Sequence, residues 1–268
     1  MAIQIGINGF GRIGRVAFRI AIDKPEEFHL CGINVRNANL EYMVYMIRYD
    51  SIFGRFQGTL DTYENGIVVN GQKIPVYSES DASLIPWGEC GAEYIIDATG
   101  AFCTTEKAMA HIRAGAKKVI VTAPAKDDVT PTFVMGINHE TYRPDMMVVS
   151  NASCTTNCLA PICKVLEDHY GIEYGLMSTI HSATAKQKVV DCRSLKDWRT
   201  GRSVFMGDGI REPEKPCRRR KARPPPLQQA PASFMPAFPR SPFFRKNLFP
   251  RSSRKASPGP PGSRPPGR

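Results

Sequence analysis

Short apolar runs alternate with helical patterns along the first 150 residues of the chain. We expect strands at residues 3–8, 29–35, 94–97, 118–121 and 146–149. Helices are expected after the first strand, with Val16, Phe18, Ile20 and Ile22, and at residues 105–114. Strands that alternate with helices are typical of an α/β fold with a parallel, doubly wound sheet.

A glycine pattern, Gly9-x-Gly11-x-x-Gly14, lies between the first expected strand and the first expected helix. In dinucleotide sites the first glycine makes a tight turn and the second lets the backbone approach the pyrophosphate. The third allows close packing of helix on strand, and the helix N-terminus binds the anion. The same letters also fit an ordinary glycine-rich turn, but their place between strand and helix favours a Rossmann-type site.

The end of the second expected strand departs from the usual NAD pattern. An acidic residue commonly stands there and binds the adenosine ribose, whereas this chain has Val35 followed by Arg36. Without a carboxylate nothing repels a 2′-phosphate, and Arg36 either supplies a cation to it or points into solvent. We therefore expect NAD or NADP as cofactor, with a slight preference for NADP or for use of both.

Residues 150–181 contain a cysteine and a histidine that could act together as a nucleophile and its base. The expected strand at 146–149 leads through a short polar turn into a helix from Cys154 to about Asp168. A second strand is expected at residues 175–182 and carries His181. A thiol at a helix N-terminus is stabilised as thiolate, and a nearby histidine can act as its base. The structural alternative is a buried cysteine with a hydrogen-bonded core histidine.

Charge divides the chain into two unlike parts. Residues 206–268 contain 15 of the 36 Lys and Arg residues, 3 of the 25 Asp and Glu residues, and 15 of the 22 prolines. No strand or helix period runs through them, so we expect a disordered basic tail. The abrupt change indicates a reading-frame shift in the coding DNA. The Arg-rich run at 218–223 could instead bind nucleic acid through its phosphates, although a solvated tail is the more common case.

The eight cysteines argue against a metal site, because they form no CxxC pair and no Cys/His cluster. We expect reduced thiols in a cytoplasmic enzyme. No apolar run is long enough to span a membrane, and the first residues do not have the pattern of a signal peptide.

The segment at residues 153–158, SCTTNC, resembles the active-site segment of phosphorylating glyceraldehyde-3-phosphate dehydrogenases. The resemblance runs from Ile3 to about Val204, and it implies a further strand at residues 133–136. It implies that Cys154 attacks the aldehyde and that His181 activates the thiol. Residues that the resemblance assigns to phosphate groups are Ser153, Thr155 and Thr184, and those it places at the cofactor are Arg12, Ile13, Thr122 and the Thr99 loop.

The resemblance also implies partners and a domain plan. The substrates would be glyceraldehyde 3-phosphate and inorganic phosphate, or erythrose 4-phosphate in a close relative, and the assembly a homotetramer. Arg193 would lie in a loop that reaches the neighbouring subunit's cofactor, which adds to the preference for NADP. We expect a dinucleotide-binding domain at 1–150, a truncated α+β catalytic domain at 151–205 and the tail at 206–268. Because the rest of the catalytic domain is missing, we expect low stability and weak activity or none.

Overall fold

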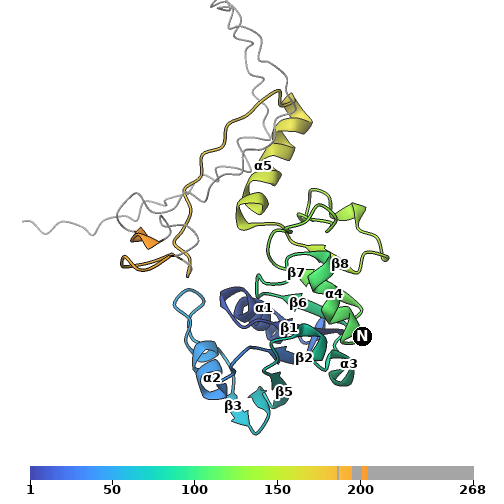
Figure 1. Ribbon diagram of the computed structural model, residues 1–268, viewed down its shortest axis with the longest axis vertical. Coiled ribbons are helices and arrows are strands. Elements are labelled where there is room, and N and C mark those ends of the chain that lie inside the picture. The colour runs from blue at the N-terminus through green and yellow to red at the C-terminus, as the bar shows by residue number, and fades with distance from the viewer. Residues whose placement is uncertain (186, 195–200, 205–268) are drawn as a thin grey trace, which may run out of the picture. The chain divides into compact units, whose positions relative to one another are not determined.

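The computed structural model describes residues 1–185, 187–194 and 201–204 (Figure 1). It divides the chain into one unit from Met1 to His181 and a second from Ser182 onward, and each is described by itself. The expected tail at 206–268, with its nucleic-acid alternative, lies outside the described residues. The domain boundaries at 150 and 205 stay predictions.

Strands alternate with helices in much of the first unit as predicted, but residues 40–77 also form a helix and three successive strands that the sequence did not predict. In chain order they are β1 (Ile3–Asn8), α1 (Arg12–Asp23), β2 (Phe28–Asn34), α2 (Leu40–Arg48), β3 (Leu60–Tyr63), β4 (Gly66–Val69), β5 (Gln72–Tyr77), η1 (Ala82–Leu84), α3 (Trp87–Cys90), β6 (Tyr94–Asp97), α4 (Thr105–Arg113), β7 (Lys118–Val121), η2 (His139–Thr141), β8 (Val148–Ser150) and α5 (Cys154–Tyr170).

These strands form one eight-stranded sheet in the order β3-β4-β5-β2-β1-β6-β7-β8. From β5 to β8 all neighbours pair in parallel, which confirms the expected α/β sheet of Rossmann type. At the other end β3 and β4 pair antiparallel. Asn70 and Gly71 join β4 to β5 with φ angles of 50° and 84°, the two positive values that a tight hairpin turn requires.

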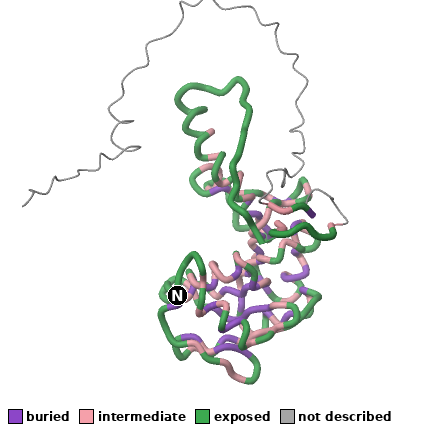
Figure 2. The backbone as a smooth tube through the Cα atoms, turned by 90° about the vertical axis from the view of Figure 1, so that its left-hand side faces the viewer, coloured by how far each residue is buried: buried purple, intermediate pink, exposed green. Residues whose placement is uncertain are grey.

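Helices cover both faces of the sheet because alternate residues of each strand point to opposite sides. Ile5 and Ile7 of β1 pack in one cluster with Phe18 of α1 and Ile47 of α2. The residue between them is Gly6, where an added Cβ would lie 2.7 Å from the Trp87 ring of α3. Figure 2 shows the buried residues gathered in this sheet and its covering helices.

Three expected strands differ from the structure in their presence or bounds. Residues 133–136 form no strand; next to them, Thr132 makes a single bridge to Ser150. The cause is Asn138, whose side chain accepts from the Val134 N–H and donates to the Thr132 carbonyl, so the chain turns there. The expected strand at 146–149 begins and ends slightly later, as β8, and that at 29–35 is β2, one residue earlier.

The strand expected at 175–182 was wrong. Residues 175–182 form no strand, and none of the described strands pairs with them in the sheet. A strand needs a neighbouring strand to complete its backbone hydrogen bonds. The preceding helix α5 has no buried residue, and apolar side chains such as Ile162 and Val165 are half exposed. An amphipathic helix gains most of its stability by burying its apolar face, so this part of the described chain lacks that support.

The third glycine of the Gly9–Gly14 turn gives a stability prediction. A Cβ on Gly14 would overlap the Gly9 carbonyl oxygen, whereas nothing lies within 4 Å of a Cβ on Gly11. We expect Gly14→Ala to lower the free energy of unfolding by about 1–3 kcal/mol through overpacking. The control, Gly11→Ala, changes only the helix N-cap and should cost less than about 1 kcal/mol. Urea unfolding followed by circular dichroism measures both, and equal costs would contradict the packing account.

Candidate functional site

The Gly9–Gly14 turn has the geometry that a bound dinucleotide needs. Gly9 has φ 93°, and a Cβ there would lie 2.8 Å from Thr99 Cγ2, so only glycine fits between the two loops. Gly11 is open on the side where a Cβ would point. Gly14 brings α1 against the carbonyl of Gly9.

The N-terminus of α1 is free to meet an anion. Gly11 is its N-cap and makes no side-chain capping bond, and no acidic residue lies in the first turn. The first N–H groups of the helix therefore keep their hydrogen-bonding capacity, and the helix dipole adds a positive end. The residues present fit a pyrophosphate at this position.

Other predicted cofactor residues lie at the same edge of the sheet. Because β2, β1, β6 and β7 are parallel, their carboxyl ends meet there. Thr99 follows β6 and Thr122 follows β7, where the Thr122 hydroxyl donates to the Asp97 carbonyl. Val35 follows β2 and packs against the core, while Arg36 beside it is exposed.

Arg12 and Ile13 begin α1 at this edge but differ in their surroundings. Ile13 is 53% exposed. The Arg12 guanidinium is paired with the Asp50 carboxylate and lies over the Phe53 ring, 5.1 Å from its centroid. Hydrogen bonds from the Phe53 N–H and from Arg12 hold the pKa of Asp50 well below its usual range. Asp50 thus fixes the Arg12 side chain, a role that the sequence analysis did not detect.

The structure brings the predicted nucleophile and base together. Cys154 is the first residue of α5, and its Sγ lies 3.0 Å from Nε2 of His181. Both residues are exposed. The alternative of a buried cysteine with a core histidine is therefore wrong for the described residues.

The turn before Cys154 is held by side chains that the sequence analysis missed. Ala152 has φ 56°, an unfavourable conformation for a residue with a Cβ. Its N–H donates to the hydroxyl of Ser150, which itself donates to the Ala123 carbonyl. The Asn157 amide donates to the carbonyls of Asn151 and Ser153. The signal in the sequence that could have indicated this turn is Asn157, a polar residue one turn into the helix.

Hydrogen bonding makes Cys154 more acidic than an ordinary cysteine. The bond with His181 lowers the pKa of its thiol most strongly, partial burial opposes this, and Thr155 adds to the lowering through its hydroxyl and N–H. Ser153 is the N-cap of α5, and its hydroxyl accepts from the Thr156 N–H. Ser153 and Thr155 thus flank the thiol, and their expected role at phosphate groups stays a prediction.

Two predicted residues lie in the second unit. Thr184 donates its N–H to Gln187 Oε1 at 2.6 Å, and Arg193 follows Cys192, whose N–H donates to the Gly201 carbonyl. Because Thr184 and Arg193 belong to the second unit, they are not placed relative to the site residues of the first unit. Within the described residues, no group of three or more His, Cys, Asp or Glu side chains could hold a metal ion. No described helix has the length and apolar character needed to cross a membrane.

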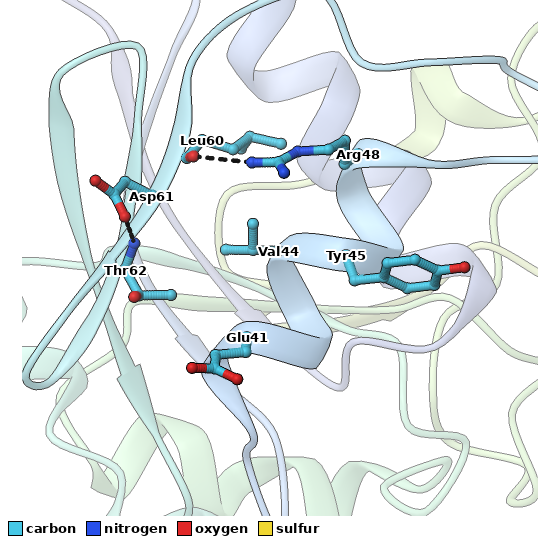
Figure 3. A pocket seen from close by; sticks show the side chains of 7 residues that line it. All are labelled: Glu41, Val44, Tyr45, Arg48, Leu60, Asp61 and Thr62. Atoms are coloured by element: carbon cyan, nitrogen blue, oxygen red, sulfur yellow. Dashed lines mark hydrogen bonds between the residues drawn. The ribbon is translucent and has the colours of Figure 1, made fainter.

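Two surface hollows of the first unit are lined by none of the predicted site residues. One is a shallow hollow between α2 and β3, where Arg48 donates to the Leu60 carbonyl (Figure 3). None of the predicted site residues lines it. A second hollow beside α2 includes Asp50, the partner of Arg12. Neither hollow contains a nucleophile or base of the predicted chemistry.

Comparisons with known proteins match the part of the chain that carries the Gly9–Gly14 turn and the part that carries Cys154 and His181. A family model described as glyceraldehyde 3-phosphate dehydrogenase, NAD binding domain, matches residues 3–105, and one for the C-terminal domain of the same enzyme matches residues 153–207. Glyceraldehyde-3-phosphate dehydrogenases of Emericella nidulans and Aspergillus niger are 55% and 54% identical over 204 residues. That length is 76% of this chain and 60% of each relative. The chain therefore spans about 60% of the length of the relatives that it matches.

The geometry of Cys154 predicts selective alkylation. Because its pKa is lowered, the thiolate forms at lower pH, so iodoacetamide should modify Cys154 several-fold faster than Cys158 near neutral pH. Cys158 is an exposed control on the same helix. His181→Ala should slow the reaction of Cys154, and the difference should shrink above about pH 9, where an ordinary thiol ionises as well. Peptide mass spectrometry measures each site, and equal rates for the two cysteines at neutral pH would contradict this assignment.

Proposed function

Because this chain belongs to the glyceraldehyde-3-phosphate dehydrogenase family, we propose that its chemistry is the phosphorylating oxidation of glyceraldehyde 3-phosphate. The observation that carries the proposal is the 3.0 Å approach of Cys154 Sγ and His181 Nε2 at the start of α5. The turn that leads to Cys154 follows β8, which is parallel to β7 at the edge that carries the Gly9–Gly14 turn. A nucleophile and a dinucleotide turn at one edge support hydride transfer from a bound substrate.

The proposed steps use Cys154 and His181 in turn. The thiolate of Cys154 attacks the aldehyde carbon, and the new thiohemiacetal oxygen takes up a proton from His181. His181 then removes that hydroxyl proton while hydride leaves the same carbon, which gives a thioester. A bound nicotinamide would supply the hydride acceptor. Attack of inorganic phosphate on the thioester carbon releases the Cys154 thiolate and forms 1,3-bisphosphoglycerate.

Groups around Cys154 suit the charges of this reaction. The backbone N–H of Cys154 lies in the first turn of α5, where it can donate to a developing oxyanion. The hydroxyls of Ser153 and Thr155 stand on either side of the thiol and can donate to phosphate oxygens. Thr184 is proposed for the same role. Erythrose 4-phosphate, which has the same aldehyde and phosphate groups, is the alternative substrate.

The cofactor proposal starts from the NAD binding domain model that matches residues 3–105. That match gives no support to a preference for NADP. We propose NAD as the cofactor and, as the finer point, that Val35 and Arg36 also admit NADP. Val35 brings no negative charge to the end of β2, and Arg36 is exposed beside it. Arg193 could add a cation from the second unit.

The proposed assembly is the homotetramer of the family in a reducing compartment such as the cytoplasm. The cysteines of the described residues are all free thiols, which suits that compartment. We expect weak turnover by this chain, because α5 buries none of its residues and no strand holds His181. The expected domain plan, with a dinucleotide-binding domain at 1–150 and part of a catalytic domain at 151–205, is kept as part of this proposal.

Acylation of Cys154 tests the reaction without requiring fast turnover. With glyceraldehyde 3-phosphate and NAD but no inorganic phosphate, the thioester should accumulate and mass spectrometry should find the acyl group on Cys154. Cys154→Ser should abolish it, and His181→Ala should slow it by about 10²–10⁴-fold because the general base is lost. Cys158→Ser is the matched control and should acylate normally. Acylation that persists in Cys154→Ser would contradict the proposed role of Cys154. Steady-state turnover as fast as in full-length relatives would contradict only the expected weak turnover.

The charge at the end of β2 gives a test of cofactor choice. We expect Val35→Asp to weaken NADP binding at least about tenfold through repulsion of the 2′-phosphate, with little loss of NAD affinity. Val35→Asn, which is similar in size but uncharged, serves as the control. Calorimetric titration of the full chain measures the dissociation constants. If the original chain binds NAD and does not bind NADP measurably, the proposal that Val35 and Arg36 admit both cofactors is wrong.

A further inference from the structure

A row of buried polar side chains crosses three neighbouring strands at the cofactor edge. Asn34, Asn8 and Asp97 are the last residues of β2, β1 and β6, and Asn8 stands opposite each of the other two. All three are at most 4% exposed. Apolar residues usually fill the interior of a parallel sheet, so three buried polar residues in one row call for a specific role.

Hydrogen bonds join the row from end to end. The Asn34 amide donates to Asn8 Oδ1 at 2.8 Å, and the Asn8 amide donates to Asp97 Oδ2 at 2.7 Å. The backbone of Glu79 holds Asn34 in place. The Asn34 amide donates to the Glu79 carbonyl, and Asn34 Oδ1 accepts from the Glu79 N–H. The orientation of both amides is therefore determined by their partners.

Two residues from the covering helices complete this network. His111 of α4 and Trp87 of α3 are 0% exposed, and the Trp87 indole N–H donates to His111 Nδ1 at 3.0 Å. An indole nitrogen can only donate, so Nδ1 must be the accepting nitrogen of the imidazole. The proton of the neutral ring then lies on Nε2, which faces Asp97 Oδ2 at 3.2 Å. Trp87 thus sets the tautomer that lets His111 donate to Asp97.

The other oxygen of Asp97 reaches out of the core to the cofactor loop. Asp97 Oδ1 accepts from the Thr99 hydroxyl at 2.8 Å and from the Thr99 N–H at 3.2 Å. The same hydroxyl accepts from the Ala101 N–H. Thr99 is exposed, and its methyl group lies 2.8 Å from where a Cβ of Gly9 would be. The loop at 98–101 is therefore anchored to a buried carboxylate and seated against the glycine turn.

We propose that Trp87, His111 and Asp97 are positioning residues that hold the 98–101 loop in the shape required for dinucleotide binding. The part concerning the dinucleotide rests on the proposed function. Each member has its bonding role fixed by the previous one: Trp87 selects the His111 tautomer, His111 and Asn8 orient Asp97, and Asp97 holds Thr99. The buried pair thus controls a surface loop that neither Trp87 nor His111 contacts through a hydrogen bond.

Three variants of the full chain separate this role from general core stability. Trp87→Phe removes the indole donor, and His111→Leu removes both imidazole roles. His111→Gln keeps both, because its carbonyl can accept from Trp87 and its N–H can donate to Asp97. Ile67→Ala, in the buried part of β4 outside the network, is the control for lost core packing.

The first readout is amide hydrogen exchange of Thr99 and Ala101 without nucleotide. We expect exchange at least about tenfold faster than in the original chain for Trp87→Phe and His111→Leu, and near the original rate for His111→Gln and Ile67→Ala. The second readout is calorimetric NAD affinity, which should fall at least about tenfold in the same two variants and change less than about twofold in His111→Gln. ¹⁵N-histidine NMR of the original chain should show the proton of His111 on Nε2.

Distinct results would overturn the proposal. It fails if Trp87→Phe exchanges at Thr99 and Ala101 as Ile67→Ala does, if His111→Gln loosens the loop as much as His111→Leu, or if the His111 proton lies on Nδ1. Should His111→Leu not fold, Trp87→Phe and His111→Gln still decide. If the original chain does not bind NAD, the proposed function is contradicted, while the exchange data still test the control of the loop.

Discussion

The parallel pairing of β2, β1 and β6 is the constraint on which the rest of the first unit depends. Parallel strands place all their carboxyl ends at one edge, so the loops after them must meet there. The glycine turn, the Thr99 loop and the turn before Cys154 all start from that edge. Buried hydrogen bonds among Asn34, Asn8 and Asp97 hold the strand ends in register. Their partners lie within residues 1–111, so the cofactor edge carries its own support.

The catalytic pair is placed differently. Cys154 gains its position from the turn after β8, and the side chains of Ser150 and Asn157 hold that turn. His181 reaches it across residues 171–180, which form no helix or strand. α5 between them exposes apolar side chains along its length, such as Ile162, Val165 and Leu166. The chemistry of the pair is present, but the sheet that would hold the histidine is not among the described residues.

Patterns in the sequence predicted those strands, turns and helix starts that depend on residues close together in the chain. Strands β6 and β7 have the bounds that the sequence predicted, and the glycine turn and the helix start at Cys154 were found from local motifs. The error at 175–182 arose because an apolar run does not reveal whether a partner strand exists. At 133–136 the resemblance implied a strand, but the hydrogen bonds of Asn138 turn the chain there.

Contacts across long stretches of sequence were beyond such patterns. Asn8 and Asp97 are 89 residues apart, and their hydrogen bond becomes visible only once β1 and β6 are paired. The ion pair between Asp50 and Arg12 also joins residues far apart in sequence, because the loop after α2 folds back to the start of α1. Predictions of the cofactor site therefore named its surface residues and missed those that hold them.

Hydrogen exchange over the whole chain, measured segment by segment, tests most directly whether the cofactor half stands on its own core while His181 does not. The account predicts that β1, β2, β6 and β7 are protected by several orders of magnitude, on the order of the global stability, and that residues 171–181 exchange within about tenfold of an unstructured peptide. Protection of residues 171–181 as strong as that of β6 would contradict it. That result would mean that His181 is held by a folded domain after all.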